Sequence, residues 1–159
     1  ISKPEKKDWY LYYSRGMSYE RSKKWKKAEK DFLYALDLFP NQPLVLNYLG
    51  YSWIDFGMKL EKAENLIKEA VKLRPNDGYF VDSLGWAYYR QGKYQKAVEE
   101  LEKAVSLVPN DPIINDHLGD ALWRAGYKNE AKFQWKRALL YNPENELKEN
   151  INFKLKKGL

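Results

Sequence analysis

Apolar side chains recur at intervals of three and four residues along most of the chain, which is the spacing of helices that bury one face. In one stretch the pattern runs through Val81, Leu84 and Tyr88, breaks at Gly92 and resumes at Leu101. A glycine at such a break is typical of a helix end, because glycine adopts the left-handed conformation at low cost. The pattern predicts helices in pairs. First helices are expected near 8–22, 43–57, 78–91 and 112–125, and second helices near 26–39, 60–73, 94–107 and 128–141.

The helix pairs recur with a period of about 34 residues. Columns of small residues and prolines follow this period: Gly16, Gly50, Gly85 and Gly119; Ala28, Ala63, Ala97 and Ala131; Ala35, Ala70, Ala104 and Ala138; and Pro40, Pro75, Pro109 and Pro143. A glycine that faces an alanine across a repeat lets the two helix backbones approach closely. The period predicts four repeats, over residues 8–41, 42–76, 77–110 and 111–143, after a lead-in of residues 1–7.

Local signals mark helix ends. Asp77 and the pair Asp111–Pro112 offer a capping carboxylate, followed in the second case by a proline at the first helical position. Beyond the repeats, residues 144–159 predict a last helix near 146–157. Its apolar stripe consists of Leu147, Ile151 and Leu155.

Three runs carry a more specific pattern: L-G-x-x-W at 49–53, L-G-x-x-Y at 84–88 and L-G-x-x-L at 118–122, each followed by two alanines and a proline. They resemble the tetratricopeptide repeat (TPR), and the resemblance covers residues 8–143. It implies an all-α fold, a right-handed superhelix of four helix-turn-helix repeats closed by a C-terminal capping helix. Repeat one departs from the pattern, with Arg15 in place of leucine and Lys23 in place of glycine, as an edge repeat does.

The composition excludes several kinds of chemistry. The 159 residues include no cysteine and one histidine, which rules out disulfides, thiolate catalysis and sites with two imidazole ligands. Asp116 and Asp120 lie one helical turn apart, but no nucleophile or phosphate-binding loop accompanies them, and His117 is expected to pack or cap. We therefore expect no enzymatic activity, no metal and no cofactor. No apolar run approaches the roughly 20 residues that cross a bilayer, which predicts a soluble protein without a membrane span.

The TPR resemblance implies protein binding on the concave face, which the first helices line. In this family the same five places of each repeat face the groove, and here they include Glu20 and Tyr79. The candidate peptide-binding residues are Tyr13, Asn47, Tyr51, Ile54, Asp55, Asp82, Trp86, Tyr89, Arg90, Asp116, Asp120, Trp123 and Arg124. Four rings among them, Tyr51, Trp86, Tyr89 and Trp123, would form an exposed ladder beside charges, as in a binding hot spot. The alternative is that these rings pack between neighbouring first helices.

The charges of this face predict the ligand. Across its twenty positions three arginines oppose five carboxylates, a net charge near −2 on a chain of net charge +6. Such a groove attracts Lys, Arg or an amino terminus. The expected partner is a protein or peptide with basic and apolar side chains, and Asp82, Asp116 and Asp120 would select its basic groups. The Lys, Asn and Arg that hold a C-terminal carboxylate in chaperone-binding TPR domains are absent.

The distribution of basic residues bears on nucleic-acid binding. Residues 1–40 hold ten Lys or Arg against six Asp or Glu, but the cluster Lys23, Lys24, Lys26, Lys27 and Lys30 falls outside the groove. A phosphate-binding surface should follow the aromatic rings, so we expect no nucleic-acid binding and a solvated convex face. A weak contact of that face with anionic lipid or another protein stays open. The alternative to peptide binding is a structural, self-associating scaffold, a homo-oligomer whose groove is filled by a neighbouring subunit.

A finer resemblance concerns location. The runs LNYLGYSWID, VDSLGWAYYRQG, INDHLGD and FQWKRAL resemble the last repeats of long bacterial TPR proteins of the cell envelope. Some of those are periplasmic lipoproteins that act as adaptors for a processing protease. The resemblance implies a bacterial scaffold or adaptor and favours the periplasm or envelope over the cytoplasm. The resemblance of the last helix to a capping helix leads us to expect that the array ends there, whereas the departures of repeat one suggest further repeats before residue 1.

Overall fold

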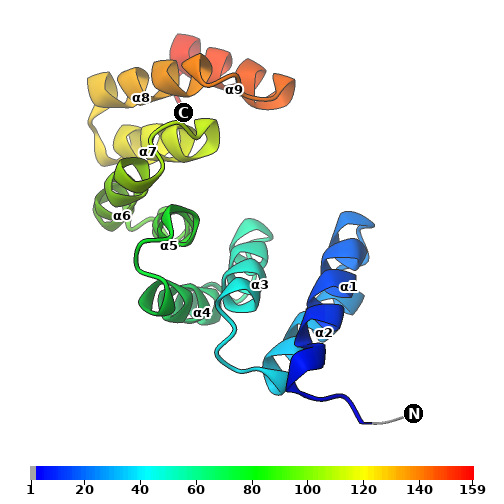
Figure 1. Cartoon of the computed structure of the whole chain (residues 1–159). Coiled ribbons are helices and arrows are strands. Elements are labelled where there is room, and N and C mark those ends of the chain that lie inside the picture. The colour runs from blue at the N-terminus through cyan, green and yellow to red at the C-terminus, as the bar shows by residue number, and fades with distance from the viewer. Residues whose placement is uncertain (1–2) are drawn as a thin grey trace.

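The structure is a computed structural model that describes residues 3–159, and this part of the chain contains nine α-helices and no strand (Figure 1). A short 3-10 helix spans Lys6–Asp8. The α-helices are α1 (Trp9–Arg21), α2 (Trp25–Leu38), α3 (Pro43–Asp55), α4 (Leu60–Leu73), α5 (Gly78–Arg90), α6 (Tyr94–Leu107), α7 (Pro112–Ala125), α8 (Lys128–Leu140) and α9 (Asn145–Lys157). Every predicted helix is present, and its ends agree to within two residues. The first two residues of the predicted lead-in 1–7 lie outside the described residues.

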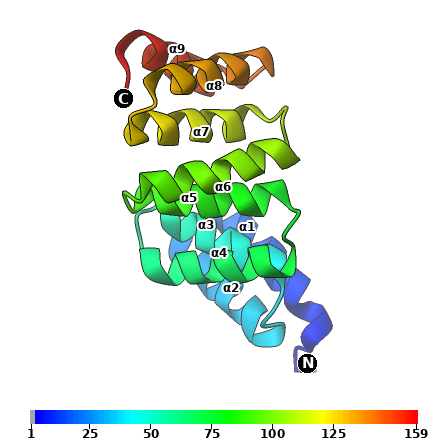
Figure 2. The same ribbon diagram turned by 90° about the vertical axis from the view of Figure 1, so that its left-hand side faces the viewer.

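The helix pairs stack side by side into an open arc, as Figures 1 and 2 show from two directions. Helices α1, α3, α5 and α7 line the inner side of the arc, and α2, α4 and α6 lie behind them (Figure 1). This all-helical solenoid confirms the predicted fold class. It also makes the first helices the concave surface on which the candidate binding residues were placed.

Within each repeat a glycine of the first helix gives room to a large side chain of the second. A Cβ built on Gly16 would come within 2.6 Å of the Phe32 ring, and one on Gly50 would come within 2.7 Å of Ile67. At Gly119 the indole of Trp135 fills the same space. The large residue that follows the alanine by one helical turn thus covers the glycine. This close approach sets the spacing of each pair.

The predicted helix signals act as expected. The Asp111 carboxylate accepts hydrogen bonds from the backbone N–H groups of Ile113 and Ile114 at 2.8 and 3.0 Å, which caps α7. After α7, Gly126 takes up the left-handed conformation with φ +99°. Lys23 holds the corresponding place in repeat one and adopts φ +58°. A lysine with a Cβ is strained in this conformation, at a cost of about 1 kcal/mol.

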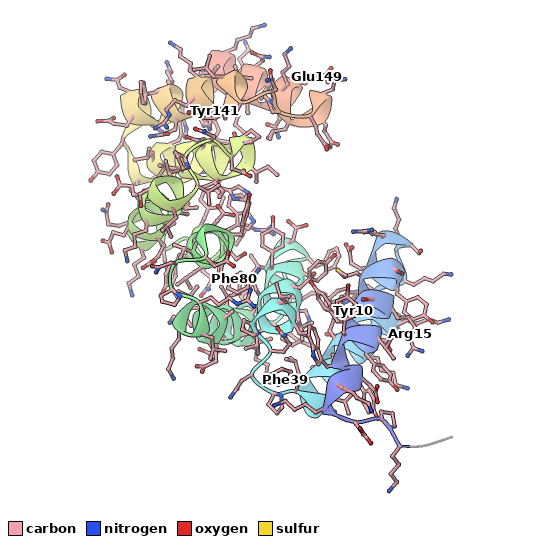
Figure 3. All side chains as sticks on the ribbon, in the orientation of Figure 1. Tyr10, Arg15, Phe39, Phe80, Tyr141 and Glu149 are labelled. Carbon is pink, nitrogen blue, oxygen red and sulfur yellow. The ribbon has the colours of Figure 1, made fainter. Side chains whose placement is uncertain are left out.

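Repeat one differs from the others because Arg15 stands where a leucine is usual. Its guanidinium donates two hydrogen bonds to the buried Asp31 carboxylate, at 2.7 and 2.8 Å. Figure 3 shows Arg15 on the side of α1 that faces away from the groove.

The ring of Tyr48 packs on those of Tyr13 and Phe32, with centroids 5.8 and 5.2 Å apart, and so joins repeats one and two. Aromatic rings therefore make this junction.

Helix α9 covers the last repeat with the predicted apolar stripe. Ile151 has no exposed surface, and Leu147 and Leu155 are half-buried. One further residue of α9 is buried without having been expected there: the Lys154 side chain lies against α7, and the residue is only 4% exposed. Its hydrogen-bond partners, Asp116 and Asp120, are two of the candidate groove residues.

Candidate functional site

The concave face has two parts that differ in what covers them. Between α1, α3 and α5 it is hollowed and open; we call this part the N-terminal hollow and define its lining below. Along α7 it is covered by α9 and the residues after it. Asp116 and Asp120 lie in the covered part, whereas Tyr51 and Asp55 lie in the open part.

The N-terminal hollow has a volume of about 300 Å³. The rings of Tyr48, Tyr51 and Tyr79 form its apolar walls, and Tyr79 is 56% exposed. Tyr48, Tyr51 and Asp55 follow each other at three and four residues on α3, so they share the face that α3 turns to the groove. The remaining lining residues are Glu20, Asn47, Ser52, Phe56, Asp82 and Ser83. The hollow therefore combines aromatic walls with carboxylates.

The hollow is negatively charged, because three carboxylates and no basic side chain line it. The Tyr48 hydroxyl donates to Glu20 Oε2 at 3.3 Å, and burial together with this carboxylate raises the pKa of Tyr48 to about 12. Burial, followed by the charges of Asp82 and Asp55, raises the pKa of Tyr51 well above its usual value. Both phenols therefore stay neutral near pH 7. The formal charge of the hollow comes from its carboxylates.

These carboxylates differ in how they are paired. Asp82 accepts from His117 Nδ1 at 2.9 Å. Arg90 Nη1 lies 3.8 Å from the exposed Asp55 carboxylate and donates to the Asp55 backbone carbonyl at 3.2 Å. Glu20 has no salt-bridge partner in the described part of the chain. Glu20 and Asp55 are thus the groups in the hollow best placed to meet a cation from outside.

Trp86 packs between neighbouring first helices, which is the alternative to an exposed ladder of rings. Its indole stacks on Tyr89 of the same helix, with centroids 4.6 Å apart, and on His117 of α7, with centroids 4.1 Å apart. Burial alone would lower the pKa of His117, but the Asp82 carboxylate outweighs burial and raises it. The expected packing role of His117 is therefore combined with a buried ion pair between α5 and α7.

The C-terminal part of the groove is closed by a lysine of the chain itself. Lys154 Nζ donates to both oxygens of Asp116 and of Asp120, at 2.8 to 2.9 Å. Trp135 Nε1 donates to Asp120 Oδ1 at 2.9 Å. Burial would lower the pKa of Lys154, but the two carboxylates raise it. Asp116 and Asp120, expected to select a ligand's basic group, thus hold the ammonium group of α9.

The Trp123 side chain is half-buried. Its indole packs against Trp135 with centroids 5.3 Å apart, and Lys128 Nζ lies 3.9 Å above the ring. Gly158, beyond α9, lies so close that a Cβ there would overlap the Trp123 indole. The ring is therefore part of the seam between α7, α8 and the C-terminal residues.

The remaining candidates divide by exposure. Ile54 has no exposed surface and Tyr13 is buried, so neither side chain is open to a ligand. Asn47 is half-buried and lines the hollow, while Arg90 and Arg124 are exposed. The four rings do not form one continuous open ladder, because Trp86 and Trp123 are packed, Tyr89 is stacked, and Tyr51 alone lines the hollow.

Four residues with functional geometry are not among the thirteen candidates: Glu20, Tyr48, Tyr79 and Lys154. Tyr48 and Tyr79 line the hollow, and Lys154 occupies the acidic pair. Tyr79 holds one of the five groove places, which was a usable signal. Lys154 lies three residues after Ile151, within the apolar stripe of its helix, and a lysine at such a place indicates a buried acidic partner.

The comparisons with known proteins agree with this architecture. The model of the family described as "Tetratricopeptide repeat" matches residues 9–42, and the model described as "TPR repeat" matches residues 85–126. The TPR repeat-containing protein PA4667 of Pseudomonas aeruginosa is 38% identical over 86 residues, which are 54% of this chain and 15% of that protein. The chain therefore spans a small part of this relative's length.

Solved structures show the same fold. The structure of PilF from Pseudomonas aeruginosa superposes with a TM-score of 0.76 at 20% identity and covers 92% of this chain and 66% of that one. MamA from Desulfovibrio magneticus RS-1 superposes with a TM-score of 0.75 at 22% identity and covers 87% of this chain and 78% of that one. The repeats in the sequence, the stacked helix pairs and these matches together identify the chain as a tetratricopeptide repeat protein.

Proposed function

We propose that this chain is a protein-binding scaffold that takes up an extended segment of a partner protein along its concave face, with the N-terminal hollow as the main contact. The TPR fold is that of a protein-interaction scaffold. The single observation that carries the finer proposal is the hollow itself. Three tyrosine rings line it beside Glu20 and the exposed Asp55, while Asp82, Asp116 and Asp120 are buried against partners within the chain.

The chemistry of the hollow favours a lysine or arginine of the partner. The aliphatic part of such a side chain would lie against the rings of Tyr51 and Tyr79, and its charge would face Glu20 and Asp55. A volume of about 300 Å³ accommodates a single large side chain rather than a folded element. Apolar residues that flank the basic one would contact the exposed Tyr79 ring and the rim at Phe56.

The covered part of the groove is assigned a smaller role. The three N–H donors of Lys154 are shared among the four carboxylate oxygens of Asp116 and Asp120. A ligand would have to displace this ammonium group from a buried site, which costs several kcal/mol. We therefore place the selection of basic residues in repeats one to three and keep the exposed Arg124 and the edge of Trp123 as secondary contacts.

Selection of peptides from a random library tests the proposal. Peptides of about twelve residues, long enough for an extended segment to cross several first helices, are displayed and selected on the immobilised protein. Sequences with Lys or Arg next to aromatic or aliphatic residues should be enriched. Binding of one fluorescein-labelled selected peptide is then measured by fluorescence anisotropy. Tyr79→Ala should raise its Kd about tenfold, as loss of a hot-spot ring does, and Glu20→Gln with Asp55→Asn should remove most of the salt dependence.

Tyr127→Ala is the matched control, because Tyr127 is an exposed tyrosine that precedes α8 and lies outside the hollow. It should leave the Kd unchanged. All variants should melt as the native protein does, since the substituted side chains are exposed or lie at the surface of the hollow. Enrichment of acidic peptides, or equal loss of binding in the Tyr79 and Tyr127 variants, would overturn the proposal.

The location stays an expectation. In residues 3–159 no helix has both the length and the apolarity that crossing a bilayer requires. The relative PA4667 is bacterial, which supports a bacterial scaffold. A bacterial periplasm or envelope is proposed from the sequence resemblance. Fusion of the full gene product to a reporter that is active only after export tests this directly.

A further inference from the structure

Helix α2 exposes an apolar pair on its outer face. The residues Lys26, Lys30, Leu33, Tyr34 and Asp37 follow one another at helical spacing on the side opposite the buried Phe32 and Ala35; we call them the α2 stripe. A shallow hollow of about 330 Å³ runs along it. At its centre Leu33 is 42% exposed and Tyr34 is 37% exposed.

The other repeats show that this pair is unusual. The place of Leu33 is held by Lys68, Glu102 and Lys136 in repeats two to four, and that of Tyr34 by Glu69, Lys103 and Arg137. Charged residues there solvate the outer helices, which is the expected composition of a convex face. Repeat one alone places two large apolar side chains at these positions, so solvation does not explain them.

The apolar surface continues onto α1. The rings of Tyr12 and Tyr34 meet edge to face with centroids 4.5 Å apart. Next to Tyr12, Leu11 is 66% exposed, whereas its counterparts Val45, Phe80 and Ile114 are buried in the other repeats. The stripe is therefore the centre of an apolar patch that spans both helices of repeat one.

The two charges nearest this pair, Lys30 and Asp37, are arranged symmetrically about it, and Lys26 lies beyond them on the helix. Lys30 and Asp37 are equally far from the point midway between Leu33 and Tyr34. A two-fold axis through that point sets Lys30 of one copy opposite Asp37 of the other and Leu33 opposite Tyr34. Such self-complementarity is what an isologous dimer requires. We propose that the α2 stripe docks a second copy of this chain, with the two α2 helices antiparallel.

This interface is separate from the peptide site. None of the stripe residues lines the N-terminal hollow, which opens on the inner side of the arc. A dimer formed this way would leave both hollows free and present two copies of the groove to a partner. Because each copy carries a net charge of +6, long-range repulsion opposes association, and we expect a Kd on the order of micromolar.

Sedimentation equilibrium of the purified chain, over concentrations from about 1 to 200 µM to bracket that Kd, tests the proposal. The native chain should approach the mass of a dimer. Leu33→Lys with Tyr34→Glu, which copies the residues of repeat two, should raise the Kd more than about 100-fold, because both copies lose the apolar centre. Leu140→Lys on α8, another strongly exposed leucine, should leave the Kd unchanged.

A charge exchange tests the antiparallel pairing. Lys30→Glu and Asp37→Lys should each raise the Kd about tenfold, because like charges then face each other twice across the axis. The double variant should return to within about threefold of the native Kd. Circular dichroism checks that every variant keeps its helix content. A chain that stays monomeric at all concentrations would mean that a different molecule covers the stripe. That result would overturn the proposal. So would a dimer that persists in Leu33→Lys/Tyr34→Glu, or a charge-exchange double variant whose Kd is as high as those of the single variants.

Discussion

Replacing Lys154 by methionine should destabilise the protein strongly, although the substitution is nearly isosteric. The native ammonium group neutralises Asp116 and Asp120, and all three residues are buried. Its removal leaves two carboxylates without a counter-charge in a site where each residue is at most 6% exposed. Breaking a buried ion pair in this way costs about 3–5 kcal/mol. We expect a loss of that size in the free energy of unfolding at pH 7, measured by urea titration with circular dichroism.

The loss should depend on pH, with a sign that follows from the carboxylates. Burial and the neighbouring Asp120 already raise the pKa of Asp116, and in the native protein Lys154 opposes the rise. Without the lysine the folded-state pKa of Asp116 rises further above the unfolded value. The penalty is then fully present above the folded-state pKa and is relieved as pH falls through it. The deficit of Lys154→Met should therefore be larger at pH 8 than at pH 5.

Two variants make this result specific. Lys156→Met removes an exposed lysine from the same helix and should change the free energy of unfolding by less than about 0.5 kcal/mol. Adding Asp116→Asn and Asp120→Asn to Lys154→Met should recover at least half of the loss, because amides carry no charge to compensate. A deficit below about 1 kcal/mol, or one that does not vary with pH, would refute the buried triad.

Three further changes test the fold. Replacing His117 by glutamine should remove a stabilising contribution of the charged imidazole. This contribution is fully present below about pH 6.5 and is lost as pH rises through the raised folded-state pKa of His117. In urea titrations the difference in the free energy of unfolding between the native protein and the variant should therefore shrink at high pH. Lys23→Gly should stabilise the protein by about 0.5–1 kcal/mol, because the residue has φ +58°; an unchanged melting temperature would contradict the strain. Gly119→Ala should cost about 1–3 kcal/mol in thermal melts, because a Cβ there meets the Trp135 indole.

The fold could be predicted closely because each of its determinants is local or periodic. Helix ends follow from the caps at Asp77 and Asp111 and from glycines such as Gly126, all of which act within a few residues. The repeat period then fixes how the pairs stack, since every junction reuses the same contacts. The apolar stripe of α9 was recognisable for the same reason: the spacing of Ile151 and its neighbours is a property of one helix.

The groove could be predicted only in part, because exposure depends on contacts between helices that are far apart in the sequence. Asp116 and Lys154 are separated by 38 residues, and nothing in either local pattern pairs them. Trp86 looks the same in the sequence whether it faces solvent or stacks on a histidine of the next repeat. Tyr51 and Asp55 were placed on the groove face by their repeat positions, and both line the hollow.

The location of the binding site on the concave face is the central claim, and a nuclear magnetic resonance titration tests it most directly. The 15N-labelled protein is titrated with a peptide selected from the random library, and backbone amide shifts are followed residue by residue. The account predicts that the shifted amides gather around the N-terminal hollow, at Tyr48, Tyr51, Asp55 and Tyr79, with little change in α9. Shifts that gather around Lys154, or on the convex face with none in α3 and α5, would contradict it.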